Sequence, residues 1–315
     1  MGDPLLVCEH VSLSYDGLRH AVSELSFTVE ASSIFALVGP NGAGKTSTLR
    51  MLATLCDPTL GRIAVDGLCA ARDREAVRRR IGYLPDNFAL YDQMTPVDYL
   101  DFFARCYAIP PAQRAKRIDE LLDEFDLAQK RKAQIRTLSR GMRQRLGIAK
   151  TLVHGPKLLL LDEPASALDP SARLKLREAL ERLKRRGLAV IISSHILPDL
   201  AGLADAVGIM EGGRMIHCGA IDTVARAAGG AAQVYRVEVA SADRARRALV
   251  DFGARVLAFE ESGPGRFDVE LDGGPDAVAD LVEALVLRGA RVSHVAPRES
   301  ALEAVYRKSA AAAVA

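Results

Sequence analysis

The stretch "SIFALVGPNGAGKTSTLR" constrains the fold more than any other part of the chain. It joins a compact apolar strand to a glycine-rich loop, and this loop runs directly into a helix. The loop fits the pattern G-x-x-x-x-G-K-[ST], with Gly39, Gly44, Lys45 and Thr46 at the defining positions. A buried strand that leads into such a loop and helix predicts an α/β fold built on a parallel sheet.

The same loop has the chemistry of a phosphate site. Gly42 and Gly44 allow the backbone to curl, so that successive N–H groups point at β- and γ-phosphate oxygens, and the helix N-terminus adds positive charge. Lys45 supplies a full positive charge, and the Thr46 hydroxyl is a ligand for Mg²⁺. The residues that we expect to contact the nucleotide are Gly39, Pro40, Asn41, Gly42, Ala43, Gly44, Lys45, Thr46 and Ser47.

A second apolar strand, in "LLLLDEP", ends in two acids, Asp162 and Glu163. Ligands of open α/β sheets bind at the carboxyl ends of the strands, so both acids are expected at the ligand crevice. Asp162 is predicted to hold Mg²⁺ through water, and Glu163 to polarise the water that attacks the γ-phosphate. Alone this motif is weak, because many buried strands end in acids. The phosphate loop makes it strong.

A third apolar strand, in "VIISSH", ends in Ser193, Ser194 and His195. A single histidine at a strand end is more often a structural residue than a ligand contact. Because this strand is expected to run parallel to "LLLLDEP", we instead predict that His195 contacts the γ-phosphate.

The order of predicted elements gives the organisation of the first domain. The first forty residues alternate as strands do, which indicates a small antiparallel layer before the buried strand. Helical patterns fill the segment at about residues 86–150, and apolar strands then return at "KLLLLDEP", "LAVIISSH" and "AVGIMEGG". We therefore predict an α/β sheet with an antiparallel β layer and a helical insertion.

A second unit follows Gly229-Gly230. Its strand and helix patterns come in the order β-α-β-β-α-β, which predicts a small ferredoxin-like α+β domain at residues 231–309. A last helix is expected at "ESALEAVYRK". The alternative is an irregular α+β extension packed on the first domain.

Bulk composition excludes several classes of protein. The chain has 42 Lys and Arg against 40 Asp and Glu, so its net charge of +2 gives no reason to expect nucleic acid as a partner. No apolar run approaches the roughly 20 residues of a membrane-spanning helix, and no secretory signal is expected. The five cysteines are scattered without the paired spacing of a zinc site.

Together these motifs resemble the ATP-binding subunit of an ABC transporter, a P-loop NTPase, over about residues 4–225. The phosphate loop, the helical insertion, "LSRGMRQR", "LLLLDEP", "SALDP" and "SSH" follow in that family's order. The extra domain and the "LSRGM" variant look like the branch that exports drugs, polysaccharides or lipids through separate membrane subunits. The resemblance implies ATP and Mg²⁺ as cofactors and ATP hydrolysis as the reaction.

The resemblance also implies a head-to-tail dimer, with a homodimer expected. In the family, the serine and glycine of the "LSRGM" motif, here Ser139 and Gly141, contact the γ-phosphate of ATP that the other subunit holds. The residues at "ALD", Ala167 to Asp169, would form the loop that crosses this interface. Tyr15 stands where the family stacks an aromatic ring on adenine, although an isolated tyrosine would more often be plain packing.

Two positions depart from the family pattern. The "LSRGM" motif usually has a second glycine and a glutamine, and Arg140 and Met142 alter that run here. At "IGYLPDNF" the family generally has glutamine, whereas this chain has Asp86. An aspartate can coordinate Mg²⁺, as the glutamine does, but it adds negative charge near the γ-phosphate. We therefore expect Asp86 to be a metal ligand that tunes the rate of hydrolysis.

The expected partners are membrane-spanning permease subunits in separate chains, which place this subunit peripherally on the cytoplasmic face of the membrane. In the family, the segment at residues 86–107 receives a helix of the membrane subunit, and here it is rich in aromatic residues. Some of these residues are expected to form the core of the helical insertion instead. Three roles remain open from the sequence: an exporter ATPase, a soluble ABC ATPase that acts on DNA or ribosomes, and an ATPase regulated by a ligand-sensing second domain. The first is favoured, because long coiled coils, zinc motifs and tandem ATPase units are missing from the sequence.

Overall fold

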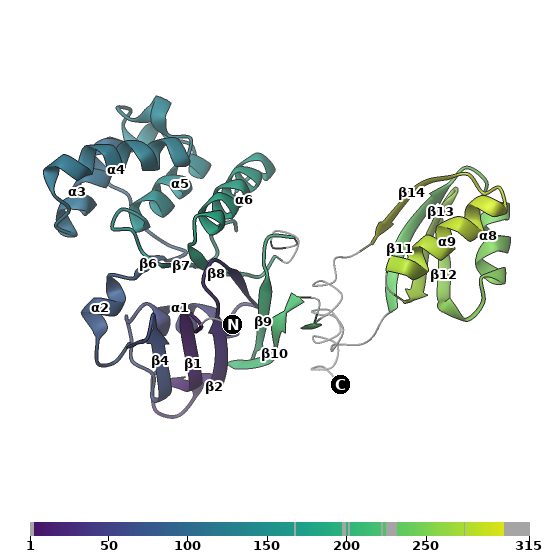
Figure 1. Cartoon of the computed structure of the whole chain (residues 1–315), viewed down its shortest axis with the longest axis horizontal. Coiled ribbons are helices and arrows are strands. Elements are labelled where there is room, and N and C mark those ends of the chain that lie inside the picture. The colour runs from purple at the N-terminus through teal and green to yellow at the C-terminus, as the bar shows by residue number, and fades with distance from the viewer. Residues whose placement is uncertain are drawn as a thin grey trace. The chain divides into compact units, whose positions relative to one another are not determined.

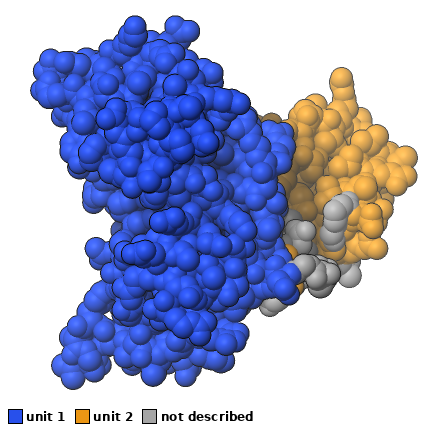
Figure 2. All heavy atoms as spheres, turned by 60° about the vertical axis from the view of Figure 1, so that its left-hand side comes forward, with its two compact units in different colours: residues 1–218 blue, residues 219–315 orange. Residues whose placement is uncertain are grey.

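The computed structural model forms two compact units, residues 1–218 and residues 219–315. Figure 2 shows the first unit in blue and the second in orange. Each unit is described by itself below. The residues that the structure describes are 3–166, 168–196, 200, 202–221, 223–224, 232–273 and 275–298.

A six-stranded sheet forms the centre of the first unit. The strand order is β10-β9-β3-β8-β7-β6, and the pairs from β9 to β6 are parallel. The strands β3, β7 and β8 are fully buried, which explains their near-continuous apolar sequences. The strands are β3 (Ile34–Val38), β6 (Ile81–Leu84), β7 (Leu158–Leu161), β8 (Ala189–Ser194), β9 (Ala206–Glu211) and β10 (Arg214–Ala220).

An antiparallel sheet with the strand order β2-β1-β4-β5 packs on this centre, as the alternating sequence predicts. Phe27 of β2 stacks on Phe35 of β3 with 5.0 Å between the ring centroids, so the two sheets share one apolar core. The elements are β1 (Leu6–Ser14), β2 (His20–Val29), β4 (Leu60–Val65), β5 (Leu68–Cys69) and the helices α1 (Lys45–Leu52) and α2 (Arg74–Arg78).

Helices replace strands between β6 and β7. The helix α3 (Pro96–Cys106) begins with a capping box, in which Thr95 and Asp98 each satisfy a backbone N–H of the other. The helices α4 (Pro111–Glu124) and α5 (Arg140–Thr151) follow, with two short 3-10 turns between them. In Figure 1 these three helices gather on one side of the central sheet, near α6 (Pro170–Arg185).

The end of α4 is tied to α6 by a buried acid. Glu124 is 8% exposed, and its Oε1 accepts a hydrogen bond of 2.9 Å from Arg182 of α6. Arg186, which caps the carboxyl end of α6, forms an ion pair with the other carboxylate oxygen. Arg182 also donates to the Glu124 carbonyl, and Arg145 of α5 donates to the Phe125 carbonyl. These bonds satisfy the last carbonyls of α4 and join the helical segment to the first unit's core.

The second unit has its own sheet and its own core. Its strand order is β12-β13-β11-β14, and all three pairs are antiparallel. Residues from both helices and the inward side of the strands form one apolar cluster, which includes Val237, Phe267 and Leu281. The elements are β11 (Ala232–Val239), α8 (Ala242–Asp251), β12 (Val256–Gly263), β13 (Arg266–Asp272), α9 (Pro275–Leu287) and β14 (Val292–Pro297). The helix expected at "ESALEAVYRK", residues 299–308, lies outside the described residues.

Among the described residues, no helix has both the length and the apolar character that crossing a bilayer requires.

The contact between α4 and α6 gives a stability prediction. Glu124→Ala removes the acid that neutralises two arginines, so it should lower the free energy of unfolding by about 2 kcal/mol, less than a fully buried pair because both arginines reach solvent. The measurement is urea unfolding followed by circular dichroism. Glu120→Ala, on the same helix, removes an exposed partner of Arg117 and should change stability by less than about 0.5 kcal/mol. Equal losses in the two variants would contradict the role of Glu124.

Candidate active site

The phosphate loop lines a cavity at the carboxyl end of β3. The cavity has a volume of about 240 Å³. Gly39 and Gly44 are required by close approaches of the backbone, because a Cβ atom would lie 2.3 Å from the Met210 carbonyl oxygen at Gly39 and 2.6 Å from the Ala21 carbonyl oxygen at Gly44. The lining residues are Ala21, Asn41, Gly42, Ala43, Gly44, Lys45, Thr46, Ser47, Asp86 and Glu163.

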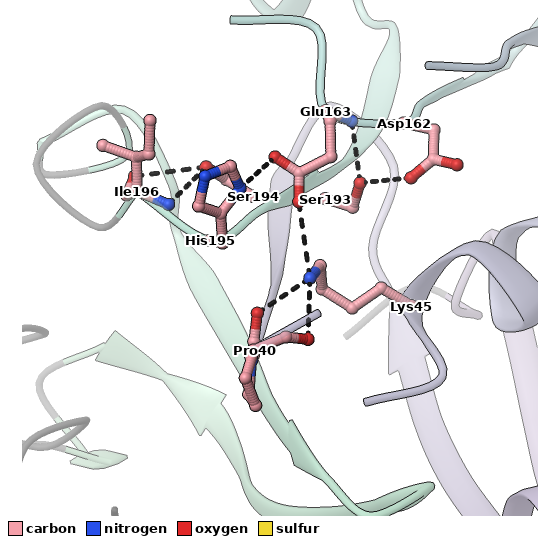
Figure 3. Close-up of polar contacts among 9 residues, drawn as sticks. Pro40, Lys45, Asp162, Glu163, Ser193, Ser194, His195 and Ile196 are labelled. Carbon is pink, nitrogen blue, oxygen red and sulfur yellow. Dashed lines mark hydrogen bonds and ion pairs between the residues drawn. The ribbon is translucent and has the colours of Figure 1, made fainter. Parts of the chain in front are cut away.

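Lys45 is the buried cation of this cavity. Its Nζ donates to the carbonyl oxygens of Gly39 at 2.7 Å and Pro40 at 3.2 Å, and it lies 3.3 Å from Glu163 Oε1 (Figure 3). Only 6% of the lysine is exposed. The loop carbonyls and one carboxylate therefore hold the ammonium group over the loop, where it can bind phosphate oxygens.

The acids predicted from "LLLLDEP" follow β7 directly, next to the end of β8. Asp162 is 1% exposed, and its Oδ1 accepts a hydrogen bond of 2.7 Å from the Ser193 hydroxyl. Its Oδ2 is buried without a hydrogen-bond partner among the described residues. Glu163 has a left-handed backbone with a φ of 46°, and its N–H donates to Ser193 Oγ at 2.9 Å. Figure 3 shows Ser193 between the two acids.

Glu163 also contacts His195, which follows β8. The Nδ1 atom of His195 lies 2.8 Å from Glu163 Oε2, on the opposite side of the carboxylate from Lys45 (Figure 3). Since a carboxylate only accepts hydrogen bonds, this contact assigns a proton to Nδ1. The structure thus brings together Lys45, Glu163 and His195, three residues that the sequence analysis took from separate motifs.

Asp86 reaches the same cavity from the loop after β6. It lines the cavity together with Glu163. Partial burial raises the pKa of its carboxyl above the ordinary value, and the negative charges of Asp162 and Glu163 raise it further. Two acids therefore line the cavity, and Asp162 directly precedes one of them in the chain.

Tyr15 lies at the other end of the phosphate loop. Its hydroxyl donates to Ser47 Oγ at 3.1 Å, and 61% of the residue is exposed. The ring is thus beside the helix that carries Lys45 and Thr46, with its surface open to solvent. An exposed ring at this position can stack on a base whose phosphates occupy the loop.

Ser139 and Gly141 do not line the cavity of their own chain. Ser139 is exposed at the start of α5, where its side chain accepts the Met142 N–H at 3.3 Å. Gly141 is buried, and a Cβ atom there would lie 2.8 Å from Ala172 Cβ of α6. The glycine therefore has a packing reason in this chain. Ala167 lies outside the described residues, while Asp169 caps α6 by accepting the Ala172 N–H at 2.9 Å.

The donor set around Asp162 fits a magnesium ion. Asp162 Oδ2 is a buried carboxylate oxygen without a hydrogen bond, and Thr46 and Asp86 line the adjoining cavity. Among the described residues, no group of three or more histidine, cysteine or acidic side chains could hold a metal ion by itself, and this includes the present site. Mg²⁺ suits such a site, because it commonly takes one or two protein oxygens and completes its shell with phosphates and water.

Comparison with known proteins identifies the family. The family described as "ABC transporter" matches residues 22–166. The ABC transporter ATP-binding protein YxlF of Bacillus subtilis, itself described as uncharacterized, is 35% identical over 308 residues, which cover 96% of this chain and 99% of YxlF. The chain belongs to the ATP-binding proteins of ABC transporters. It is an ATPase subunit of a transporter complex that includes membrane subunits, and the resemblance seen in the sequence is confirmed.

Other relatives and solved structures agree with this assignment. The ATP-binding protein NatA of B. subtilis is 36% identical over 205 residues, 65% of this chain and 83% of NatA. The daunorubicin resistance ATP-binding protein DrrA3 of Streptomyces coeruleorubidus is 32% identical over 312 residues, 97% of this chain and 96% of DrrA3. A solved ATP-binding subunit of an ABC transporter superposes with a TM-score of 0.64 at 30% identity, covering 71% of this chain and 92% of that one.

One residue of the site was not singled out by its sequence motif. Ser193 stands in "VIISSH" as an ordinary strand-end serine, yet it contacts both acids of "LLLLDEP". The sequence feature that could have indicated this role is a serine two residues before His195, in a strand expected to run parallel to "LLLLDEP".

The crowding of acids at the cavity gives a pH-dependent prediction. The pKa of Asp86 is higher in the folded protein than in the unfolded chain, so the ionised carboxylate destabilises the folded state. This cost is fully present above the raised pKa and disappears as the pH falls through it. Asp86→Asn should therefore raise Tm by about 2 °C at pH 8, and this gain should fade as the pH falls through the raised pKa. Calorimetry in EDTA at several pH values measures it. A gain that is the same at every pH would contradict the electrostatic cause.

Proposed function

We propose that the chain drives substrate export by binding ATP and Mg²⁺ at the cavity of the phosphate loop, with Glu163 as the base of hydrolysis. The observation that carries the proposal is the position of Glu163, whose carboxylate lies between Lys45 at 3.3 Å and His195 at 2.8 Å. A carboxylate between two phosphate-binding groups is placed to orient a water molecule at the γ-phosphate.

The phosphates are held by the loop. Backbone N–H groups of the loop and the N-terminus of α1 face the β- and γ-phosphates, and Lys45 adds a charge. His195, which donates to Glu163 from Nδ1, donates to a γ-phosphate oxygen from Nε2 when both nitrogens are protonated. Tyr15 stacks on adenine. Each of these contacts orients ATP without taking part in proton transfer.

Magnesium would be held by Thr46, Asp162 and Asp86. When bound, it neutralises charge that develops on the phosphate oxygens during transfer. Asp162 Oδ2 is free to face it or one of its waters. Asp86 provides a negatively charged ligand where the family generally has a neutral amide, and we propose that this sets the rate of hydrolysis.

Glu163 carries out the proton chemistry. Phosphate oxygens compete with its carboxylate for Lys45, and a water molecule then takes the place at Oε1 that the ammonium group leaves. Glu163 accepts a proton from this water as the water attacks the γ-phosphate in line with the leaving oxygen. The contact with His195 holds the other carboxylate oxygen in place.

A second subunit would complete the site. Ser139 is exposed at a helix start, and neither Ser139 nor Gly141 lines its own chain's cavity. A head-to-tail homodimer, in which each helix start meets the phosphate loop of the other chain, gives these residues a ligand. Leu168 and Asp169 would lie at the same interface.

The names of relatives support a role in export. DrrA3 is described as a daunorubicin resistance protein. The Nod factor export ATP-binding protein I of Ralstonia nicotianae is 37% identical over 213 residues, 66% of each chain. An export ATPase is placed peripherally on the cytoplasmic face of the membrane. These relatives favour this role over a soluble ATPase acting on DNA or ribosomes, because their names refer to transport, export or drug resistance.

The helical segment offers a surface for such membrane subunits. Tyr91 is 52% exposed, Phe102 is 41% exposed and Tyr107 is 43% exposed. Tyr91 and Phe102 make an edge-on contact with 6.0 Å between ring centroids. We propose that residues 86–107 receive a helix of the membrane subunit, because exposed aromatic side chains are typical of protein interfaces.

The second unit is proposed to be a ferredoxin-like domain at residues 231–309. The β-α-β-β-α-β order and the strand order β12-β13-β11-β14 support this name. A role in supporting the dimer is preferred over ligand sensing, because the Gly-rich segment at residues 261–267 lies at the hairpin between β12 and β13.

Glu163→Gln tests the hydrolysis site and the dimer together. The amide cannot act as the base and binds Lys45 less strongly than the carboxylate does, so Mg-ATP should convert purified monomer to dimer while turnover falls at least about 100-fold. Light scattering with and without Mg-ATP measures the association. Lys45→Ala is the control that should lose ATP binding and remain monomeric. A Glu163→Gln monomer with ATP bound would contradict the homodimer.

Transport direction has a separate test. In inside-out vesicles that contain the chain with its membrane subunits, Mg-ATP should drive daunorubicin, a drug named for one relative, into the lumen. Glu163→Gln should abolish the accumulation. Failure with a panel of drugs and lipids, together with co-sedimentation of the chain with ribosomes or DNA, would instead favour the alternative function.

A further inference from the structure

We propose that Ser193 is a positioning residue of ATP hydrolysis, which sets the Asp162 carboxylate for Mg²⁺ and the Glu163 backbone for catalysis. The inference rests on the roles proposed for these two acids. Ser193 is the fifth residue of β8, and none of its surface is exposed.

The strand register puts Ser193 beside the acids. Leu161 of β7 pairs with Ile192 of β8 in the parallel ladder, so the next residues of both strands, Asp162 and Ser193, are neighbours. Their side chains meet at 2.7 Å, although 31 positions separate them in the sequence. Figure 3 shows the serine side chain between Asp162 and the Glu163 N–H.

The Ser193 hydroxyl makes two hydrogen bonds, one as donor and one as acceptor, to two different acidic residues. It donates to Asp162 Oδ1 and accepts the Glu163 N–H at 2.9 Å. A hydroxyl has a single hydrogen to donate, so the accepted N–H directs that hydrogen toward the carboxylate. One serine therefore fixes a side chain and an adjacent peptide group at once.

The first consequence concerns the metal. With Oδ1 occupied by the hydroxyl, Asp162 presents Oδ2, the buried oxygen that has no hydrogen bond, in one orientation. A partner that orients a metal ligand typically matters 10- to 100-fold for metal affinity or activity. Without the hydroxyl, the carboxylate of Asp162 can rotate about its χ2 angle, which is a soft torsion.

The second consequence concerns the base. Glu163 has a φ of 46°, a left-handed conformation that a glutamate adopts only under constraint. Its N–H is fixed by Ser193, and its side chain reaches Lys45 and His195. The hydroxyl thus supports the backbone bend that aims the carboxylate across the cavity.

Another serine makes half of this arrangement without lining the cavity, so it separates the support of a bent backbone from the support of the site. Ser12 is 4% exposed, and its Oγ accepts the N–H of Glu24 at 2.9 Å. Glu24 also has a left-handed backbone, with a φ of 49°. Ser12 therefore supports a bent glutamate as Ser193 does. Neither Ser12 nor Glu24 lines the phosphate-loop cavity.

The test compares Ser193→Ala with Ser12→Ala. Ser193→Ala should lower kcat about 10- to 100-fold with less than about a threefold change in the KM for ATP. It should also raise, about 10-fold, the Mg²⁺ concentration that gives half of the thermal stabilisation by a non-hydrolysable ATP analogue. Ser12→Ala should lose similar thermal stability without these changes.

Two further variants keep the test decisive. Ser193→Thr retains the hydroxyl and should restore most of kcat and the Mg²⁺ midpoint. Should Ser193→Ala not fold, Ser193→Cys keeps the shape with a weaker hydrogen-bond donor and should give the same split in kcat and Mg²⁺ dependence. Ser193→Ala or Ser193→Cys that behaves as Ser12→Ala does, with wild-type kcat and Mg²⁺ midpoint, overturns the proposal.

The proposed function and this inference fail in different ways. Asp162→Asn and Glu163→Gln that hydrolyse ATP at the wild-type rate would remove the roles of the acids themselves. If both of these variants lose turnover while Ser193→Ala keeps the wild-type kcat and Mg²⁺ midpoint, the proposed roles of the two acids stand. Only the positioning role of Ser193 is then rejected.

Discussion

The parallel pairing of β3, β8 and β7 is the constraint on which the site depends. Parallel strands end at the same edge of a sheet, so this pairing brings the phosphate loop, His195 and the two acids after Leu161 to one place. The apolar sequences of the three strands fix that pairing, because the strands are buried on both faces. Burial of leucine, valine and isoleucine in these strands thus brings together the phosphate loop and His195, which lie far apart in the sequence.

The sequence predicted best what is encoded locally. The phosphate loop could be found because strand, glycines and helix lie within one stretch, and the antiparallel layer because its alternation is regular. The bond between Ser193 and Asp162 could not be found, because it depends on the register of two strands 31 positions apart. Gly141 was read as a ligand contact from its motif. Its packing on Ala172 became visible only once α5 and α6 were placed.

The acids of the site outnumber its buried lysine. Lys45 faces Glu163, and Asp162 has one oxygen held by a neutral hydroxyl and one without a hydrogen bond. Asp86 adds a third acid, whose pKa is raised by partial burial and by the other two. Such a set of groups suits an anion at the lysine and a cation at the acids, and a magnesium complex of ATP would supply both.

The helical segment grips α6 at two places. Gly141 packs against Ala172 near the start of that helix, and Glu124 binds Arg182 and Arg186 near its end. Ten residues of helix, about 15 Å, separate Ala172 from Arg182. Two attachments this far apart fix both the position and the direction of α6 relative to the helical segment, which a single contact could not do.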